Sequence, residues 1–224
     1  MSKVEISFQI PSLPPPHAYA LYISLEENGS SAKVLYQKEF LGRDSITKEE
    51  IEEEGYSTDD DLSWEGTIPA IWFRDTLALT RESEFTSEPQ ENSICHIEHQ
   101  KINGFATNVA QWEYLIEELF QALLEKEEEE APLNMKITIN NQQWLLKASF
   151  LNKVFSINNQ EIAWKELRNF LISLEEIETS EKDTQKMKSN KAYISFDGES
   201  HSEIRGKKSA ESLSRTLHDM LLGN

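Results

Sequence analysis

The densest cluster of side chains that could do chemistry is Cys95-His96-Ile97-Glu98-His99, with a thiol, two imidazoles and a carboxylate. All three groups are zinc ligands in proteins. The turn-prone pair Asn92-Ser93 and the alternation after it favour a strand, in which Cys95 and His99 face one side and His96 and Glu98 the other. Three ligands then cannot converge on one ion. We therefore predict a strand with a polar outer face, and no metal or other cofactor.

The remaining motifs for catalysis or ion binding fail on their spacing. A calcium loop beginning at Asp59 needs glycine at its sixth position and an acid at its twelfth, but Trp64 and Ala70 stand there. The chain has no Gly-x-Ser-x-Gly elbow and no glycine-rich phosphate loop. Cys95 is interpreted as a buried, inert thiol. We predict that the protein is not an enzyme.

One acidic segment combines carboxylates with a large aromatic side chain. Tryptophan is favoured both in protein cores and at the energetic centres of interfaces, so two interpretations of Trp64 stay open. It either covers the edge of its own core or anchors a basic partner. The candidate partner-binding residues are Asp59, Asp60, Asp61, Trp64 and Glu65.

The net charge of −18 is concentrated in the first part of the chain. Residues 1–131 hold 28 acidic and 9 basic residues, whereas residues 132–224 hold 12 and 13. Such a balance favours a basic protein partner and argues against direct binding of nucleic acid or of an anionic membrane. With one cysteine and no apolar segment that resembles a signal peptide or a membrane span, the expected compartment is the cytoplasm.

Hydrophobic periodicity in the first half predicts strands and two helices. Residues 4–10 alternate as a half-buried strand, and residues 19–25 and 33–40 form a hairpin around Asn28-Gly29. Thr47 and Glu50 make a capping box for a short helix that ends at Gly55. Residues 56–66 are predicted to be an exposed loop. Residues 68–81 fit either a helix or a buried strand, and the helix is favoured.

The rest of the chain predicts extended segments that are each followed by one amphipathic helix. These helices begin at Val109, near Glu161 with Ala163 in its core stripe, and at Ser209. A shared Trp-x-x-Leu pattern at Trp112 and Trp164 suggests a duplicated strand-then-helix unit. The predicted strands are residues 93–102, 135–139, 143–150, 154–157 and 193–196, with a return strand after a turn at Asp197-Gly198.

Together the patterns predict an α+β protein, with a mainly antiparallel sheet built from hairpins and three principal helices packed on it. The acidic run that ends at Pro132 marks a boundary between an N-terminal half, residues 1–131, and a C-terminal half, residues 132–224, although one domain is the alternative. The function expected is that of a non-enzymatic binding or regulatory protein. The alternatives are an inhibitor that mimics nucleic acid and an enzyme of unrecognised type.

Overall fold

The structure is a computed structural model that describes residues 2–89, 93–181, 191–196 and 200–223. The chain forms two compact units, residues 1–120 and residues 121–224. Each unit is an antiparallel sheet with helices on one face, so the protein is α+β. No helix in the described ranges is long and apolar enough to cross a bilayer.

The N-terminal unit contains a seven-stranded sheet with the strand order β4-β3-β2-β1-β6-β7-β5. Every neighbouring pair is antiparallel. The strands are β1 (Lys3–Gln9), β2 (Tyr19–Asn28), β3 (Ser31–Phe40), β4 (Leu62–Pro69), β5 (Phe85–Thr86), β6 (Ile94–His99) and β7 (Ile102–Ala106).

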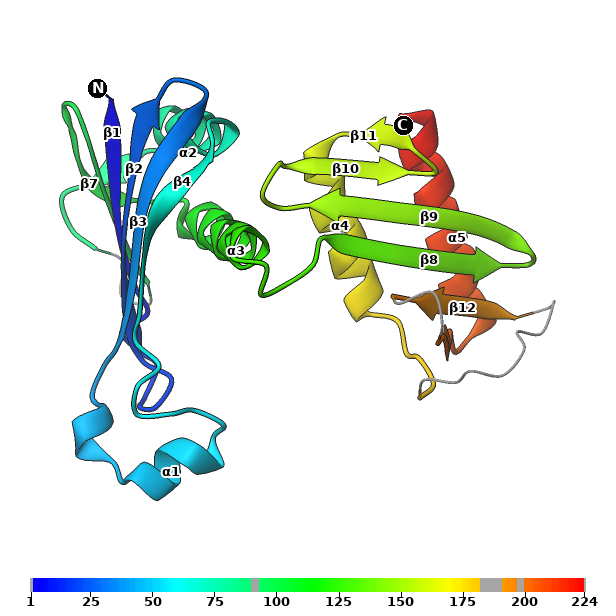
Figure 1. Ribbon diagram of the computed structural model, residues 1–224, viewed down its shortest axis with the longest axis horizontal. Coiled ribbons are helices and arrows are strands. Elements are labelled where there is room, and N and C mark those ends of the chain that lie inside the picture. The colour runs from blue at the N-terminus through cyan, green and yellow to red at the C-terminus, as the bar shows by residue number, and fades with distance from the viewer. Residues whose placement is uncertain (1, 90–92, 182–190, 197–199, 224) are drawn as a thin grey trace. The chain divides into compact units, whose positions relative to one another are not determined.

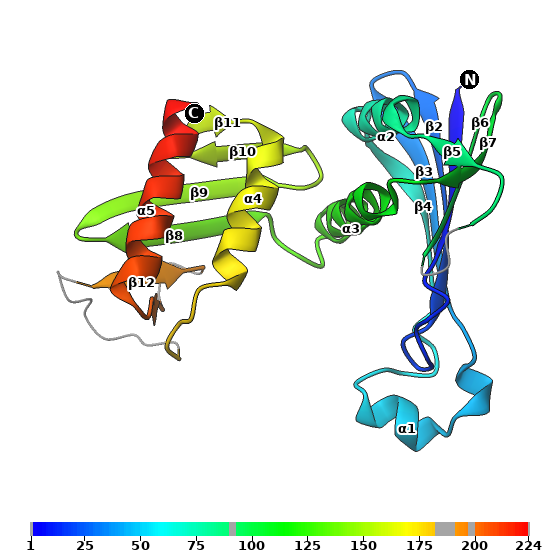
Figure 2. The same cartoon turned by 180° about the vertical axis from the view of Figure 1, so that it is seen from behind.

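Period-2 patterning decides which face of this sheet is buried. Val4, Ile6 and Phe8 of β1 are at most 2% exposed, and the residues between them face the other side. Two helices, α2 (Ile71–Glu82) and α3 (Val109–Lys126), lie on the apolar face (Figures 1 and 2). The Trp112 indole of α3 donates a hydrogen bond to Ser83, the residue that ends α2. No helix of the described part of the N-terminal unit lies on the opposite face of the sheet (Figures 1 and 2).

Beyond one end of the strands, residues 41–61 form a lobe that contains α1 (Lys48–Glu53) (Figure 1). The predicted capping box is confirmed, because Thr47 accepts from the Glu50 amide and the Glu50 carboxylate accepts from the Thr47 amide. Gly55, with φ 81°, follows α1 as predicted.

The exposed loop predicted for residues 56–66 is wrong in its second half. Residues from Leu62 onward form β4, which pairs with β3 over eight consecutive positions. The acidic residues before β4 favoured the prediction of a loop, although exposed and less exposed residues alternate from Leu62 through Ile68. The helix favoured for residues 68–81 is confirmed from Ile71 onward as α2, whereas Ile68 and Pro69 end β4.

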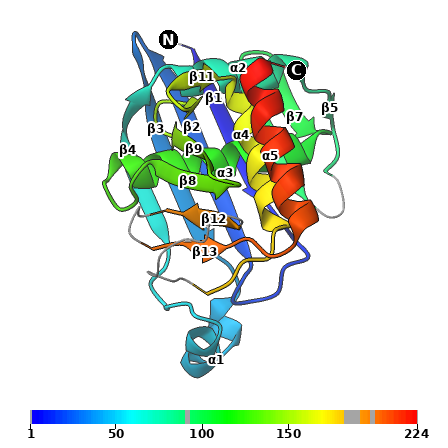
Figure 3. The same cartoon turned by 90° about the vertical axis from the view of Figure 1, so that its right-hand side faces the viewer.

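The C-terminal unit contains a six-stranded sheet with the order β11-β10-β9-β8-β12-β13. Its two helices, α4 (Trp164–Glu175) and α5 (Lys207–Leu222), lie side by side on one face (Figures 2 and 3). Leu167, Phe170 and Leu217 are fully buried between this sheet and its helices. The strands are β8 (Leu133–Ile139), β9 (Gln142–Ser149), β10 (Val154–Ile157), β11 (Gln160–Ile162), β12 (Ala192–Ser195) and β13 (Ser202–Glu203).

Two predictions in this unit need correction. The helix expected near Glu161 begins at Trp164, because residues 160–162 form β11 against β10. Ala163 is consequently exposed and is not part of a core stripe. The turn predicted at Asp197-Gly198 lies outside the described residues.

The observed division into units falls within α3, whereas the predicted boundary follows that helix. The core of the C-terminal unit is nevertheless built from residues beyond Pro132. The last turn of α3 contributes Glu125, whose carboxylate accepts hydrogen bonds from the Phe150 and Leu151 amides and the Ser149 hydroxyl. The duplication of a strand-then-helix unit stays a prediction.

Candidate interaction surface

The uncovered face of the N-terminal sheet presents side chains in rows that cross the strands. The register places Ser63, Gln37, Tyr22, Ser7 and His96 side by side across five strands. This central row is polar and carries no carboxylate. The other rows across these strands contain five carboxylates and two ammonium groups: Glu5, Glu26, Glu39, Glu65 and Glu98 against Lys3 and Lys33.

A shallow depression of about 510 Å³ lies on this face. The polar side chains of Tyr22, Gln37 and Ser63 line it together with two carboxylates, Glu39 and Asp61. A surface of this kind offers many hydrogen-bonding groups in an anionic setting, and it is open rather than enclosed. It is therefore suited to a macromolecular partner better than to a small molecule, which would need deeper burial.

The side chains near the depression are held by hydrogen bonds to one another. The Tyr22 hydroxyl donates to the Glu5 carboxylate, and Lys3 Nζ donates to the same oxygen at 2.9 Å. The Tyr22 hydrogen bond, and then that from Lys3, lowers the pKa of Glu5, while the bond to Glu5 raises the pKa of Tyr22. The Glu5 carboxylate of β1 is thus held in place as an anion by a hydrogen bond from Tyr22 on the neighbouring strand, β2.

The strand predicted around Cys95 is confirmed as β6, and its alternation separates the possible ligands. Cys95 is buried, and burial raises the pKa of its thiol to about 12. On the same side, His99 Nδ1 lies 2.7 Å from the Lys3 carbonyl oxygen. His96, on the open face, lies 2.9 Å from the Asn103 side-chain oxygen. Within the described ranges no three His, Cys, Asp or Glu residues are grouped as a metal site.

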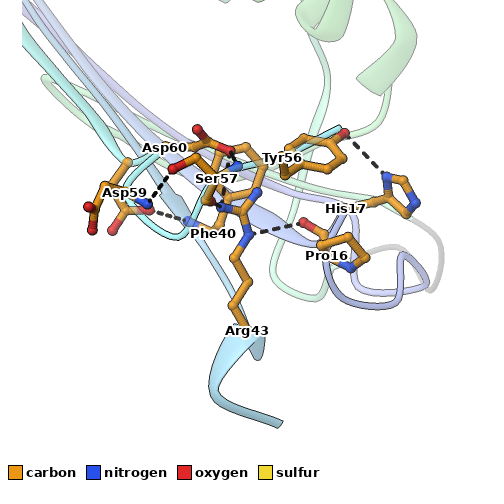
Figure 4. A network of polar contacts seen from close by, with 9 residues as sticks. Pro16, His17, Phe40, Arg43, Tyr56, Ser57, Asp59 and Asp60 are labelled. Carbon is orange, nitrogen blue, oxygen red and sulfur yellow. Dashed lines mark hydrogen bonds and ion pairs between the residues drawn. The ribbon is translucent and has the colours of Figure 1, made fainter. Parts of the chain in front are cut away.

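The acidic lobe is fixed to the sheet by one arginine (Figure 4). The Arg43 side chain is 10% exposed and its guanidinium carbon lies 3.7 Å from the centre of the Phe40 ring and 4.9 Å from that of Tyr56. It donates hydrogen bonds to the carbonyls of Pro16 and Ser57 and pairs with Asp60 at 3.3 Å. These contacts join the two ends of the lobe to the base of β3.

Lys38 adds a second cation beside these rings. Its Nζ lies 4.5 Å from the centre of the Tyr19 ring and 4.6 Å from that of Phe40. Burial and then the positive charge of Arg43 lower the pKa of Lys38, while Asp60 raises it. Asp60 pairs directly with Arg43 and accepts from the Ser57 amide, which makes it part of the framework that holds the lobe.

The structure gives the three predicted aspartates different environments. Asp60 accepts from Arg43 and from the Ser57 amide, and Asp61 accepts from the Phe40 amide at 2.8 Å. Asp59 is exposed, and its backbone amide donates to the Ser57 hydroxyl at 3.3 Å. Asp61 also lines the depression on the open face.

The register places Trp64 and Glu65 on opposite faces of β4. Glu65 is exposed on the open face, opposite Leu35 of β3. Trp64 is half-buried on the helix-bearing face, where its ring covers Gly66 so closely that an added Cβ would lie 2.5 Å away. Asp61 and Glu65 thus belong to one surface, whereas Trp64 belongs to the other.

Sequence reasoning missed the residues that complete the open face. Tyr22, Glu5 and Glu98 come from three strands and become neighbours only through the strand register. The alternation within each strand was a usable signal, since it predicts which residues face away from the core. The order of the strands was not predicted, so the rows could not be assembled.

Compared with protein-family models, curated proteins and solved structures, the chain shows no significant match. Its function must therefore be inferred from its own residues.

Proposed function

We propose that this chain is a non-enzymatic binding or regulatory protein of the cytoplasm, whose acidic N-terminal unit binds a basic protein partner. The supporting observation is the placement of its charge. Residues 1–120 hold 23 acidic and 8 basic residues, a net of −15, whereas residues 121–224 hold 17 and 14, a net of −3.

The lobe supports this proposal because most of its charge is exposed. Among the described residues, Glu49, Glu53 and Asp44 are exposed and have no ion-pair partner. Exposed carboxylates of one sign attract a cationic partner over about a Debye length and accelerate its association. The Arg43 contacts hold the lobe in place, so these carboxylates are presented on an ordered element.

The open face of the N-terminal sheet supplies the second part of the argument. Its carboxylates surround polar and aromatic groups that can form short-range contacts once a partner has been attracted. Charge alone gives fast but weakly specific association, and specificity requires hydrogen bonds and packed side chains. The N-terminal unit offers both.

The test begins with affinity capture from the source cell at low salt, followed by purification of the captured protein. We expect a basic protein that is released at high salt. In kinetic measurements, Glu49→Gln/Glu53→Gln/Glu65→Gln should slow its association about tenfold at low ionic strength. The matched control, Glu161→Gln/Glu175→Gln/Glu176→Gln, removes three exposed charges from the C-terminal unit and should change the rate much less.

Equal rates for the two triple variants would contradict the proposal, and so would a captured partner that is not basic. Release of the partner by duplex DNA would instead favour an inhibitor that mimics nucleic acid, because both ligands would then occupy one site.

A further inference from the structure

The exposed edge of β4 distinguishes the N-terminal sheet from the C-terminal one. β4 is eight residues long, whereas the other terminal strands of the two sheets, β5, β11 and β13, have two or three residues. β13 is also flanked by residue 180, whose amide donates to the Glu203 carbonyl at 2.9 Å. Among the described residues, β4 is therefore the one long strand at a sheet edge.

One hydrogen bond identifies which backbone groups of β4 point away from the sheet. The Ala70 amide donates to the Ser30 carbonyl, so this opposed pair is hydrogen-bonded. Opposed pairs in an antiparallel ladder alternate, and the register continues without a break from Ser31↔Pro69 to Lys38↔Leu62. The amides and carbonyls of Ser63, Glu65 and Thr67 consequently face away from β3.

These outward groups have no hydrogen-bond partner among the described residues. Sheet edges are commonly protected by lysine, by a bulge or by an inward-pointing charge. β4 contains no basic residue and no interruption of its register, and its proline stands at the last position. The edge is thus chemically able to accept a further strand.

The charge beside this edge restricts the strand that could pair with it. Glu65 lies at the centre of β4 on the open face, and Asp61 lies just before β4, where it lines the depression on that face. A second copy of the chain would bring another unit of net charge −15 to this edge, which opposes self-pairing. An extended basic segment is favoured instead, since cross-strand pairs of opposite charge are stabilising.

We propose that the β4 edge binds an extended segment of a basic protein as an added β-strand. This inference rests on the proposed function and specifies how its partner is recognised. Lys or Arg residues four positions apart would lie opposite Asp61 and Glu65, with a polar residue opposite Ser63 between them. Apolar residues at the intervening positions would lie beside Leu62, Trp64 and Ile68, on the helix-bearing face. The backbone ladder supplies affinity and the alternating side chains supply specificity.

The experiment uses the full-length, ¹⁵N-labelled protein and a capped nonapeptide, Lys-Val-Ser-Val-Lys-Val-Ser-Val-Lys. We expect peptide binding to slow hydrogen exchange of the Ser63, Glu65 and Thr67 amides. The variant Ser63→Pro/Thr67→Pro removes two outward donors without removing a hydrogen bond to β3, because edge strands tolerate proline at such positions. It should weaken peptide binding at least about tenfold, whereas the matched variant Ser63→Ala/Thr67→Ala should stay within about twofold of the natural protein.

A charge exchange tests the same strand independently if the proline variant does not fold. Glu65→Lys should lose affinity for the lysine peptide and gain affinity for the same peptide with Glu in place of Lys. Strand addition is overturned if this exchange has no effect, or if a folded proline variant binds the peptide as tightly as the natural protein. It is also overturned if the natural protein does not bind the peptide.

The proposed function survives these results if the captured basic protein still associates in a manner that depends on salt and on Glu49 and Glu53. If that association is also absent, both proposals fail. If the natural protein is a dimer and Ser63→Pro/Thr67→Pro is a monomer, the β4 edge binds a second copy of the chain. That result would overturn the proposal that a basic segment binds there.

Discussion

The two units of this protein have the same layered construction but differ in what they leave exposed. Each has an antiparallel sheet with one face covered by helices. The N-terminal unit adds a long edge strand, β4, an acidic lobe and a net charge of −15. The C-terminal unit has short terminal strands and a net charge of −3.

From this difference we expect the stability of the protein and its proposed binding of a partner to depend on different parts of each sheet. The buried face of each sheet supplies the apolar packing that the fold requires, and the two units have that in common. Edges and surface charge contribute little to folding but decide which partner can approach. The N-terminal unit is therefore the one in which variants should separate binding from stability.

The largest expected effect is a loss of stability without a loss of binding. Leu217 is fully buried in the core of the C-terminal unit, so Leu217→Ala should lower its free energy of unfolding by about 3 kcal/mol. Chemical denaturation measures this loss, and Leu222→Ala, at a position that is 71% exposed, is the control. Where the variant is still folded, its association with the basic partner should be unchanged. A parallel loss of binding would break the comparison between the units.

A smaller effect is expected at Arg43, where stability and binding should change together. Arg43→Ala removes the cation from the Phe40 and Tyr56 rings and leaves Asp60 without its ion pair. We expect a loss of about 2 kcal/mol in the local stability of the lobe. Hydrogen exchange of residues 41–61 measures it, with Arg81→Ala on an exposed face of α2 as the control. Unchanged exchange in the lobe would show that Arg43 is dispensable for its order.

The smallest effect concerns the pH dependence of the open face. The pKa of Glu5 is lowered in the folded protein, so its stabilising contribution is present above the usual carboxyl pKa, about pH 4.3, and is lost as the pH falls through the lowered value. Tyr22→Phe removes the main cause and should move the Glu5 pKa upward, with a stability loss near pH 7 of less than about 1 kcal/mol.

Carboxyl-detected NMR titration measures the effect of Tyr22→Phe. Glu50, whose pKa is lowered by hydrogen bonds to Thr47 in the lobe, is an internal control that should not move. A Glu5 titration that is unaffected by the substitution would show that Tyr22 does not order this part of the surface.

The sequence by itself determined the local structure wherever the pattern was regular and the signals agreed. Alternation predicted β1 and the β2–β3 hairpin, the Thr47–Glu50 capping box predicted α1, and the amphipathic pattern that begins at Ser209 predicted α5. These are short-range effects of period, capping and turn chemistry. The uneven distribution of charge along the chain was also evident from the sequence, because counting charged residues requires no structure.

Only the tertiary structure decided what each candidate residue does. Asp59, Asp60 and Asp61 are three consecutive residues of one type, and the sequence does not distinguish their roles. In the structure, Asp60 pairs with Arg43 and Asp61 accepts a hydrogen bond from the Phe40 amide. Asp59 is exposed. The sequence did not predict β4, because its alternation is short and largely polar and the segment is held as a strand by its pairing with β3. Such pairings join residues that are distant in the chain, so the edge position of β4 and the carboxylates beside it arise from strand order, which local patterns do not encode.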